Sequence, residues 1–295
     1  MIHIKTIHQL HKLAGLKEPK HPLFSIHKIE DLQLDSEYFP EKMTYDFYTV
    51  GLKKNLNGYV KYGRTNYDFQ EGTLGFTAPF QLMEFSLDII QNAKGWILFF
   101  HRELLNSTKF EKSIDEYGFF EYAVNEGLHL SKDEEKSIED ILQNIEKEYL
   151  LPIDKYSKQV VLSNLELLFT YSDRYYSRQF IVRNEVSTAI FSNFKAELKS
   201  AFNDNDKLPT VERLAEKLNL SANYLSDYLK TTTGNSAIEH IHGYIVTQAQ
   251  KELISSDKSI SEIAFELGFE YPHYFSRLFK KKTGLTPSEY RLESE

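Results

Sequence analysis

The chain has 295 residues, of which 41% are hydrophobic and 26% are charged, and its formal net charge is -8. This length and composition are typical of a globular protein with room for two domains, and no apolar run approaches the roughly 18 residues that cross a bilayer. The first residues lack a secretory signal, and the absence of cysteine excludes disulfides, thiol catalysis and cysteine-based zinc sites. We therefore expect a cytoplasmic protein with no membrane partner.

The first region, residues 1–110, is predicted to be rich in β-structure. Short aromatic and β-branched stretches recur over 45–100, with turn signals between them such as Asn57-Gly58 and Ala78-Pro79. Short strands at regular spacing favour a β-sandwich or a small barrel, and Trp96 is expected in its core. Five tyrosines in this stretch either line an aromatic pocket or divide between core and surface: Tyr45, Tyr48, Tyr59, Tyr62 and Tyr67.

The second region, residues 111–203, is predicted to be helical. Ser131 and Glu134 have the spacing of a capping box, and apolar residues follow at helical intervals. These residues are Ile138, Ile141, Leu142, Ile145 and Tyr149. Pro152 ends this helix, and a second amphipathic stretch runs over about 154–202. Either stripe can pack within the chain or across a two-fold axis, so we expect a connector that takes part in dimerisation.

The last region, residues 204–295, follows a polar linker and contains an internal repeat. Val211, Ala215 and Leu218 recur 49 positions later as Ile260, Ala264 and Leu267, while six further matches recur 50 positions later, among them Gly234 and Gly284. The second copy thus has one extra residue, which we place between its two helices. A repeat in this register is far more specific than a single match to a short motif.

Each copy is predicted to form a helix-turn-helix unit, at about 210–234 and 259–284. Gly268 lies where the chain turns with positive φ, and Asn219 holds that place in the first copy. Residues 236–255 are predicted to form one helix between the units, about 30 Å long. Since successive major grooves of B-DNA lie about 34 Å apart on one face, double-stranded DNA is favoured over RNA as the partner.

The segment 208–291 resembles the AraC/XylS family of bacterial transcription regulators, and IAFELGFEYPHYFSRLFKKKTGLTPSEYR matches that family's signature almost throughout. The resemblance implies a DNA-binding domain of two helix-turn-helix units joined by a linker helix. It also implies a cupin-like N-terminal domain that senses a small-molecule effector or forms a homodimer, with RNA polymerase as a further partner. Activation is favoured over repression by the resemblance alone. The predicted fold class is α+β, with an all-α C-terminal domain.

The resemblance also carries over a set of DNA-binding residues by position. In the first unit, the residues that would face bases are Asn223, Ser226 and Asp227, and those near phosphate are Lys230 and Thr231. In the second unit, the residues that would face bases are Pro272, His273, Ser276 and Arg277, and those along the DNA backbone are Lys280, Lys281 and Lys282. Arg reads guanine and Asn reads adenine by paired hydrogen bonds, whereas the carboxylate of Asp227 meets phosphate repulsion unless it accepts from cytosine. From Asp206 onward eleven cations face thirteen carboxylates, so we expect modest affinity per protomer and a need for dimerisation.

Two groups of residues in the second unit have an alternative role that does not involve contact with DNA. The three lysines could form a solvated helix end that only complements the helix dipole, but their place in a second helix-turn-helix copy favours phosphate contact. The aromatic and apolar residues Tyr274, Phe275, Leu278 and Phe279 are expected in the core of the unit rather than stacked on bases.

No sequence feature supports catalysis. The region 45–100 has no histidine for a cupin-type metal site, and GxSxG, HExxH and phosphate-binding glycine loops are absent. His8 and His11 share a helical face, but a metal needs three or four ligands. We therefore predict no enzyme, no catalytic residue, no cofactor and no metal. The alternatives are a dimeric regulator without an effector and, more remotely, a cupin-like enzyme fused to a DNA-binding domain.

Overall fold

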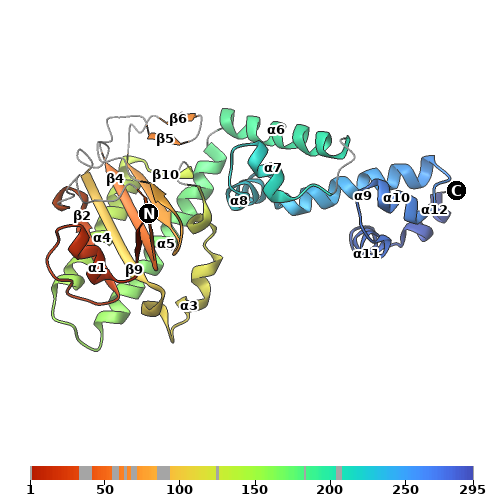
Figure 1. Cartoon of the computed structure of the whole chain (residues 1–295). Coiled ribbons are helices and arrows are strands. Elements are labelled where there is room, and N and C mark those ends of the chain that lie inside the picture. The colour runs from red at the N-terminus through yellow and green to blue at the C-terminus, as the bar shows by residue number, and fades with distance from the viewer. Residues whose placement is uncertain are drawn as a thin grey trace. The chain divides into compact units, whose positions relative to one another are not determined.

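The computed structural model of the chain, shown in Figure 1, forms two compact units, Met1–Gln179 and Phe180–Glu295. It describes residues 2–32, 42–54, 60–62, 65–67, 72–84, 94–123, 126–182, 184–203 and 208–294. The predicted turn at Asn57-Gly58, Tyr59 and most of the predicted linker lie outside these residues, and so do the side chains of Tyr62 and Tyr67. The predicted domain boundaries stay predictions; compact packing divides the chain after Gln179.

The N-terminal unit is built on a five-stranded sheet of order β10-β7-β4-β9-β2, in which all neighbours are antiparallel. Its strands are β2 (Phe24–Lys28), β4 (Phe47–Lys54), β7 (Thr73–Thr77), β9 (Lys94–His101) and β10 (Leu128–His129). Because side chains alternate between the faces of a strand, residues two apart on β4 face the same layer. Trp96 is 1% exposed, which confirms its predicted place in the core.

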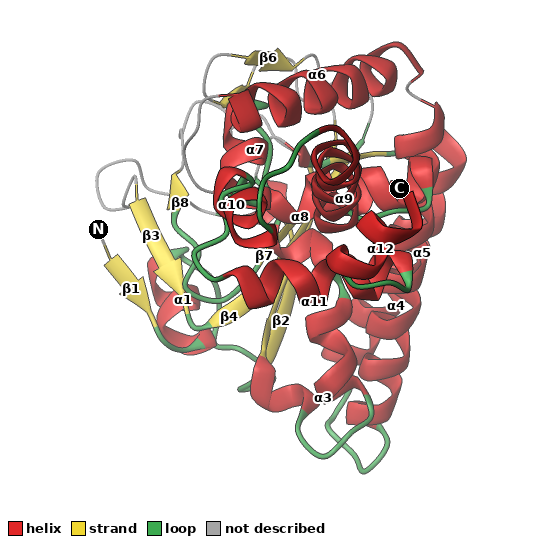
Figure 2. Cartoon of the chain, turned by 90° about the vertical axis from the view of Figure 1, so that its right-hand side faces the viewer, coloured by secondary structure: helices red, strands yellow, loops and turns green. Residues whose placement is uncertain are grey.

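A second, smaller sheet has the order β1-β3-β8, with β1 parallel to β3 and β8 antiparallel to it; Figure 2 shows the three strands side by side. These strands are Ile2–Ile4, Lys42–Tyr45 and Met83–Glu84. Helix α1 (Ile7–Leu13) packs with them into one apolar cluster made of Ile4, Ile7, Leu10, Met43, Tyr45, Phe47 and Phe99. A separate pair, β5 (Val60–Tyr62) and β6 (Thr65–Tyr67), completes the described strands. The predicted strand-rich region is confirmed, and its cupin-like identity stays a prediction.

Helix α4 (Lys132–Leu150) begins with the predicted capping box. The Ser131 hydroxyl accepts from the Glu134 amide at 3.4 Å, and the Ser131 amide donates to the Glu134 carboxylate at 2.9 Å. All five residues of its predicted apolar stripe are buried. Since the Trp96 indole donates to Glu139 at 3.2 Å, this helix lies against the sheet and its stripe is core.

The single amphipathic stretch predicted over 154–202 is two helices, α5 (Ser157–Val182) and α6 (Asn184–Asn203). Phe169 of α5 is fully buried. The centroid of its ring lies within 6.3 Å of the ring centroids of Phe76 on β7, Phe100 on β9, and Phe110 and Phe120, which lie between β9 and α4. The residues between β9 and α4 include α3 (Phe110–Ser113). The described part of the unit also contains the short 3-10 helices η1 (Ile29–Asp31), η2 (Arg102–Leu105), η3 (Ile114–Glu116) and η4 (Gly118–Glu121). The inner face of α5 is therefore core, as the sequence pattern indicates.

The C-terminal unit consists of helices, as Figures 1 and 2 show. After α6 they are α7 (Val211–Lys217), α8 (Ala222–Thr233), α9 (Ala237–Ser255), α10 (Ile260–Glu266), α11 (Pro272–Thr283) and α12 (Pro287–Ser294). Both copies of the repeat have helices of 7 and 12 residues, and the connections are residues 218–221 and 267–271, so the extra residue lies where the sequence placed it. Among the described helices, none is long and apolar enough to span a membrane.

Candidate nucleic-acid interface

The turn between the two helices of each unit has the same backbone hydrogen bonds. In the first copy Leu220 N donates to Ala215 O at 2.9 Å and Asn219 N to Glu216 O at 3.0 Å. In the second copy Phe269 N donates to Ala264 O at 3.0 Å and Gly268 N to Phe265 O at 2.9 Å. This pair of bonds is the Schellman motif, which requires a left-handed residue after the helix. Asn219 has φ 57° and Gly268 has φ 88°, so both predicted turn residues are confirmed.

Each unit has a small, buried residue in its first helix. Ala215 and Ala264 are both buried, as expected where two helices cross closely. Phe275 and Phe279 of α11 are fully buried, which confirms their predicted core role. Tyr274, predicted in the core, is 55% exposed instead. Successive residues on a helix are rotated by about 100° about its axis, so the side chain of Tyr274 does not lie on the buried face that carries its neighbour Phe275.

Helix α11 presents its cations on the exposed side. His273, Arg277, Lys280, Lys281 and Lys282 are all exposed, whereas Pro272 and Ser276 are half-buried. Residues 273, 277 and 280 or 281 recur at helical intervals and therefore share one face. The Ser276 hydroxyl donates to Pro272 O at 3.2 Å, so it is engaged within its own helix. The last turn carries the three lysines, and Gly284 caps the helix with φ 86°.

Helix α8 presents a different surface. Lys230 is its exposed cation, and Asn223, Ser226, Asp227 and Thr231 are half-buried. Its core face is formed by Tyr224, Leu225, Tyr228 and Leu229, all buried. The structure thus places the predicted residues of each unit on the second helix of that unit. Their contacts with DNA stay predictions.

Lysines at the ends of α8 and α11 influence the start of α9. Hydrogen bonds from Ser236 lower the pKa of Glu239, and the charges of Lys282 and Lys230 lower it further. Burial lowers the pKa of His242, and Lys282 and Lys281 add to that shift. Lysines at the ends of α8 and α11 therefore act on the same first turns of the linker helix.

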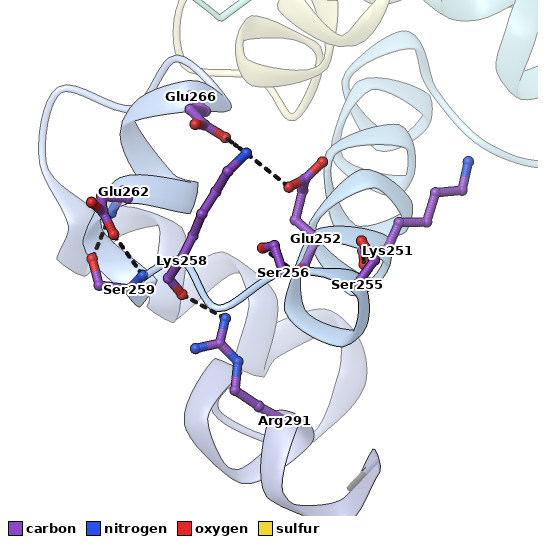
Figure 3. A network of polar contacts seen from close by, with 9 residues as sticks. All are labelled: Lys251, Glu252, Ser255, Ser256, Lys258, Ser259, Glu262, Glu266 and Arg291. Atoms are coloured by element: carbon purple, nitrogen blue, oxygen red, sulfur yellow. Dashed lines mark hydrogen bonds and ion pairs between the residues drawn. The ribbon is translucent and has the colours of Figure 1, made fainter.

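Two cations of the domain are engaged inside it, as Figure 3 shows. Lys258 Nζ binds Glu266 at 2.7 Å and Glu252 at 3.1 Å, and the guanidinium of Arg291 donates to Lys258 O at 2.7 Å and to Leu253 O at 3.1 Å. Leu253 O is among the last carbonyls of α9, which have no partner within the helix. This network joins α9, α10 and α12, so neither cation serves phosphate contact as the structure stands.

The role of Arg291 was not among the predictions from the sequence. The signal was present in the repeat, because position 291 corresponds to Ile241, which is 2% exposed in α9. A position that is interior in one copy is expected to be interior in the other. Lys217, which forms an ion pair with Glu197 of α6 at 3.0 Å, had no comparable signal.

The comparisons with known proteins converge on this domain. Residues 214–293 match the model of the helix-turn-helix domain family. The MmsAB operon regulatory protein of Pseudomonas aeruginosa is 40% identical over 81 residues, which are 28% of this chain and 26% of that relative. The uncharacterized HTH-type transcriptional regulator YfiF of Bacillus subtilis is 24% identical over 261 residues, 84% of this chain and 77% of that relative. The first of these relatives is thus matched over about a quarter of its length.

A solved structure matches the same region. The C-terminal domain of AraT, a response regulator from Geobacillus stearothermophilus, is 34% identical, with 35% of this chain and 84% of that chain covered at a TM-score of 0.33. The C-terminal domain is a helix-turn-helix domain of the AraC/XylS type. For this domain, the resemblance that the sequence signature indicated is therefore confirmed.

Proposed function

We propose that the protein is a sequence-specific, double-stranded DNA-binding transcription regulator. The observation that carries this proposal is the duplicated unit. In each copy a Schellman turn precedes a second helix of 12 residues. The linker helix α9 has 19 residues and is therefore about 28 Å long. A rod of this length suits two recognition helices in successive major grooves of one duplex.

The exposed residues of α11 support the assigned roles in the second unit. Arg277 is positioned to read a base, since guanidinium groups pair with guanine through two hydrogen bonds. Lys280, Lys281 and Lys282 follow at the end of the same helix and supply phosphate contacts. In α8, Asn223, Ser226 and Asp227 face bases and Lys230 and Thr231 lie near phosphate. Tyr274 adds an exposed aromatic ring to the start of α11.

The N-terminal unit is proposed to dimerise through the outer side of its last helices. Exposed apolar residues gather around the end of α4 and the start of α5: Leu150, Leu151, Ile153, Tyr156, Val160 and Leu167. Val160 and Leu167 are seven residues apart, so they share one face of α5. A second copy covering this surface would double the number of recognition helices, which compensates for the modest charge of each domain.

The same unit is proposed to sense a small-molecule effector, and the protein to act in the cytoplasm as an activator that contacts RNA polymerase. The MmsAB operon regulatory protein and YfiF are both named as regulators, which supports a role without catalysis. The second candidate is a regulator that dimerises without an effector, and the exposed face of α5 serves both.

The test is a selection of genomic fragments by the purified full-length protein, followed by affinity measurements on the recovered sequence and on random DNA. We expect the recovered sequence to bind at least about 10³-fold more tightly, the usual lower range for specific recognition. Equal affinity for recovered and random duplexes would refute sequence-specific binding.

A further inference from the structure

A cavity of about 90 Å³ lies in the N-terminal unit, on one face of the five-stranded sheet. Its wall includes Thr49 and Lys53 of β4, Ile97 and Phe99 of β9, and Met83 of β8. Thr49 and Lys53 are an even number of residues apart, so they belong to the face opposite the one that carries Leu52. The cavity thus lies within the strand-rich unit and far in sequence from the helix-turn-helix units.

Two glycines leave the floor of this cavity open. Gly51 of β4 and Gly75 of β7 are register partners and both line the cavity. A Cβ built at either position meets no atom within 4 Å, and neither residue has a left-handed φ. The backbone therefore does not require glycine, and the missing side chains are what create the space. Glycine inside a strand is typical of a site where another group approaches the backbone closely.

A lysine without an ion-pair partner among the described residues borders the cavity. Lys53 is half-buried, and within the described part of the chain no hydrogen bond or ion pair engages its ammonium group. Burial alone lowers the pKa of Lys53. The next residue, Lys54, lies on the opposite face and binds Glu135 at 3.0 Å and Glu139 at 2.5 Å. Of two adjacent lysines, only the one on the cavity side lacks a carboxylate, and an unpaired ammonium out of water is costly.

Further groups restrict what the cavity can accept. Thr49 is 6% exposed, and its hydroxyl has no hydrogen-bond partner among the described residues. Most of the remaining wall is apolar, including Tyr45, Phe76 and Phe99. Glu126 also lines the cavity and is 5% exposed, with its carboxylate accepting from the Ala123 amide at 2.5 Å. A second acid group on a ligand would meet this carboxylate.

We infer that the cavity binds a small monocarboxylate, with its acid group on the Lys53 ammonium and its apolar body over Gly51 and Gly75. The Thr49 hydroxyl offers a hydrogen bond at the other side of the glycine floor. The size points to a short-chain acid, since a cavity of about 150 Å³ accepts benzene. This inference rests on the proposed effector-sensing role of the N-terminal unit and names the class of effector.

The experiment compares matched probes on the full-length protein by titration calorimetry and thermal unfolding. Butyrate is the test compound, butyramide its neutral isostere, butylamine its cationic counterpart, succinate the dianion and inorganic phosphate the non-organic anion. We expect butyrate to bind with a dissociation constant of about 1 mM or below, within the ceiling for about six heavy atoms. The other four probes should bind at least about tenfold more weakly, a difference of about one charged contact.

Variants connect this binding to the cavity. Lys53→Met should weaken butyrate binding at least about tenfold and raise the melting temperature of the ligand-free protein, because an unpaired cation is removed. Gly75→Val should fill the floor and also abolish binding. Lys136→Met, which changes an exposed lysine of α4, is the matched control and should leave binding unchanged.

The inference is overturned if butyrate does not bind, if butyramide or phosphate binds as tightly, or if Lys53→Met retains wild-type affinity. Binding to the selected DNA fragment is measured on the same preparation. Intact sequence-specific DNA binding with no butyrate binding removes this inference alone, whereas butyrate binding with no specific DNA binding removes the proposed regulator and leaves the ligand site.

Discussion

The two helix-turn-helix copies share a backbone and differ in charge. Their helices have equal lengths, their turns make the same hydrogen bonds, and both recognition helices end at a left-handed glycine. At matched positions, however, Asp227 stands where the second copy has Arg277, and threonines stand where it has Lys281 and Lys282. The turn and cap residues determine the backbone of each unit, so the exposed residues of its second helix can differ in charge. The second copy has three lysines at the end of its second helix where the first has one, so it is better equipped to anchor on phosphate.

The copies also differ in the helix that comes after the recognition helix. The first continues into α9, where Ile241 is buried, and the second continues into α12, where Arg291 holds carbonyl groups of α9 and of Lys258. The same position serves packing in one copy and a charged network in the other. The attachment of the second copy to the linker helix therefore includes polar contacts.

Neutralising the lysine run should have the largest effect on DNA binding. Lys280→Gln, Lys281→Gln and Lys282→Gln together should lower the salt slope by about 3 and weaken binding to all sequences, since each phosphate contact contributes about 0.9 to the slope. Lys230→Gln in the first copy is the matched control, with an expected decrease of about 1 or less. The measurement is affinity against salt concentration, and a decrease for the triple variant no larger than that for Lys230→Gln would remove the proposed asymmetry.

Removing Arg291 should have the next largest effect, on stability. Arg291→Ala leaves carbonyl groups of Leu253 and Lys258 without their donor, which we expect to cost about 2 to 3 kcal/mol of unfolding free energy. Lys251→Ala, on the exposed side of α9 near the same network, is the control and should change stability by less than about 0.5 kcal/mol. Denaturant unfolding measures the stability of both variants. A loss of similar size in the two would show that the Arg291 contacts stabilise the domain no more than an exposed side chain does.

Removing the base-reading cation should act on specificity. Arg277→Ala should cost about 1 to 3 kcal/mol on the selected sequence and relax the preference at one base pair. Asp227→Ala at the matched position should leave binding unchanged or strengthen it, because a carboxylate near phosphate is removed. Competition with single-base variants of the selected site measures both. Equal losses of Arg277→Ala on selected and random DNA would exclude base readout by this residue.

Exchanging the turn residues should give the smallest effect. Gly268→Ala forces a Cβ into φ 88° and should cost about 1 to 2 kcal/mol of stability. Asn219→Gly at the matched turn should cost at most a few tenths of a kcal/mol, since glycine adopts that conformation freely. Thermal unfolding measures the pair, and a neutral Gly268→Ala would mean that the second turn does not require its left-handed residue.

Much of the fold was predictable where the signal was local. The capping box at Ser131, the turn residues Asn219 and Gly268, and the extra residue between α10 and α11 all follow from short spacings. The predicted stretch over 154–202 was wrong in its continuity, because helical periodicity does not mark where one helix ends and the next begins. Tyr274 was placed in the core because it adjoins the stripe of Phe275 and Phe279.

The features that escaped prediction depend on contacts between distant positions. The repeat marks position 291 as interior, but no spacing rule identifies the partner of Arg291, a carbonyl 38 residues away. The open floor of the cavity exists because Gly51 and Gly75 become register partners, which only strand pairing determines. Lys53 and Lys54 have the same chemistry in the sequence, and the sheet alone assigns one to the cavity and the other to α4.

The central claim is that both copies engage one duplex while the second supplies most of the anchoring. Methylation interference at guanine N7 on the selected fragment, with the full-length protein, tests this most directly. We expect two interfering major-groove clusters for each protomer, about 10 base pairs apart on the same face of the duplex, with the stronger interference at the cluster that Arg277→Ala abolishes. A single cluster for each protomer, or two of equal strength that both persist in Arg277→Ala, would contradict it.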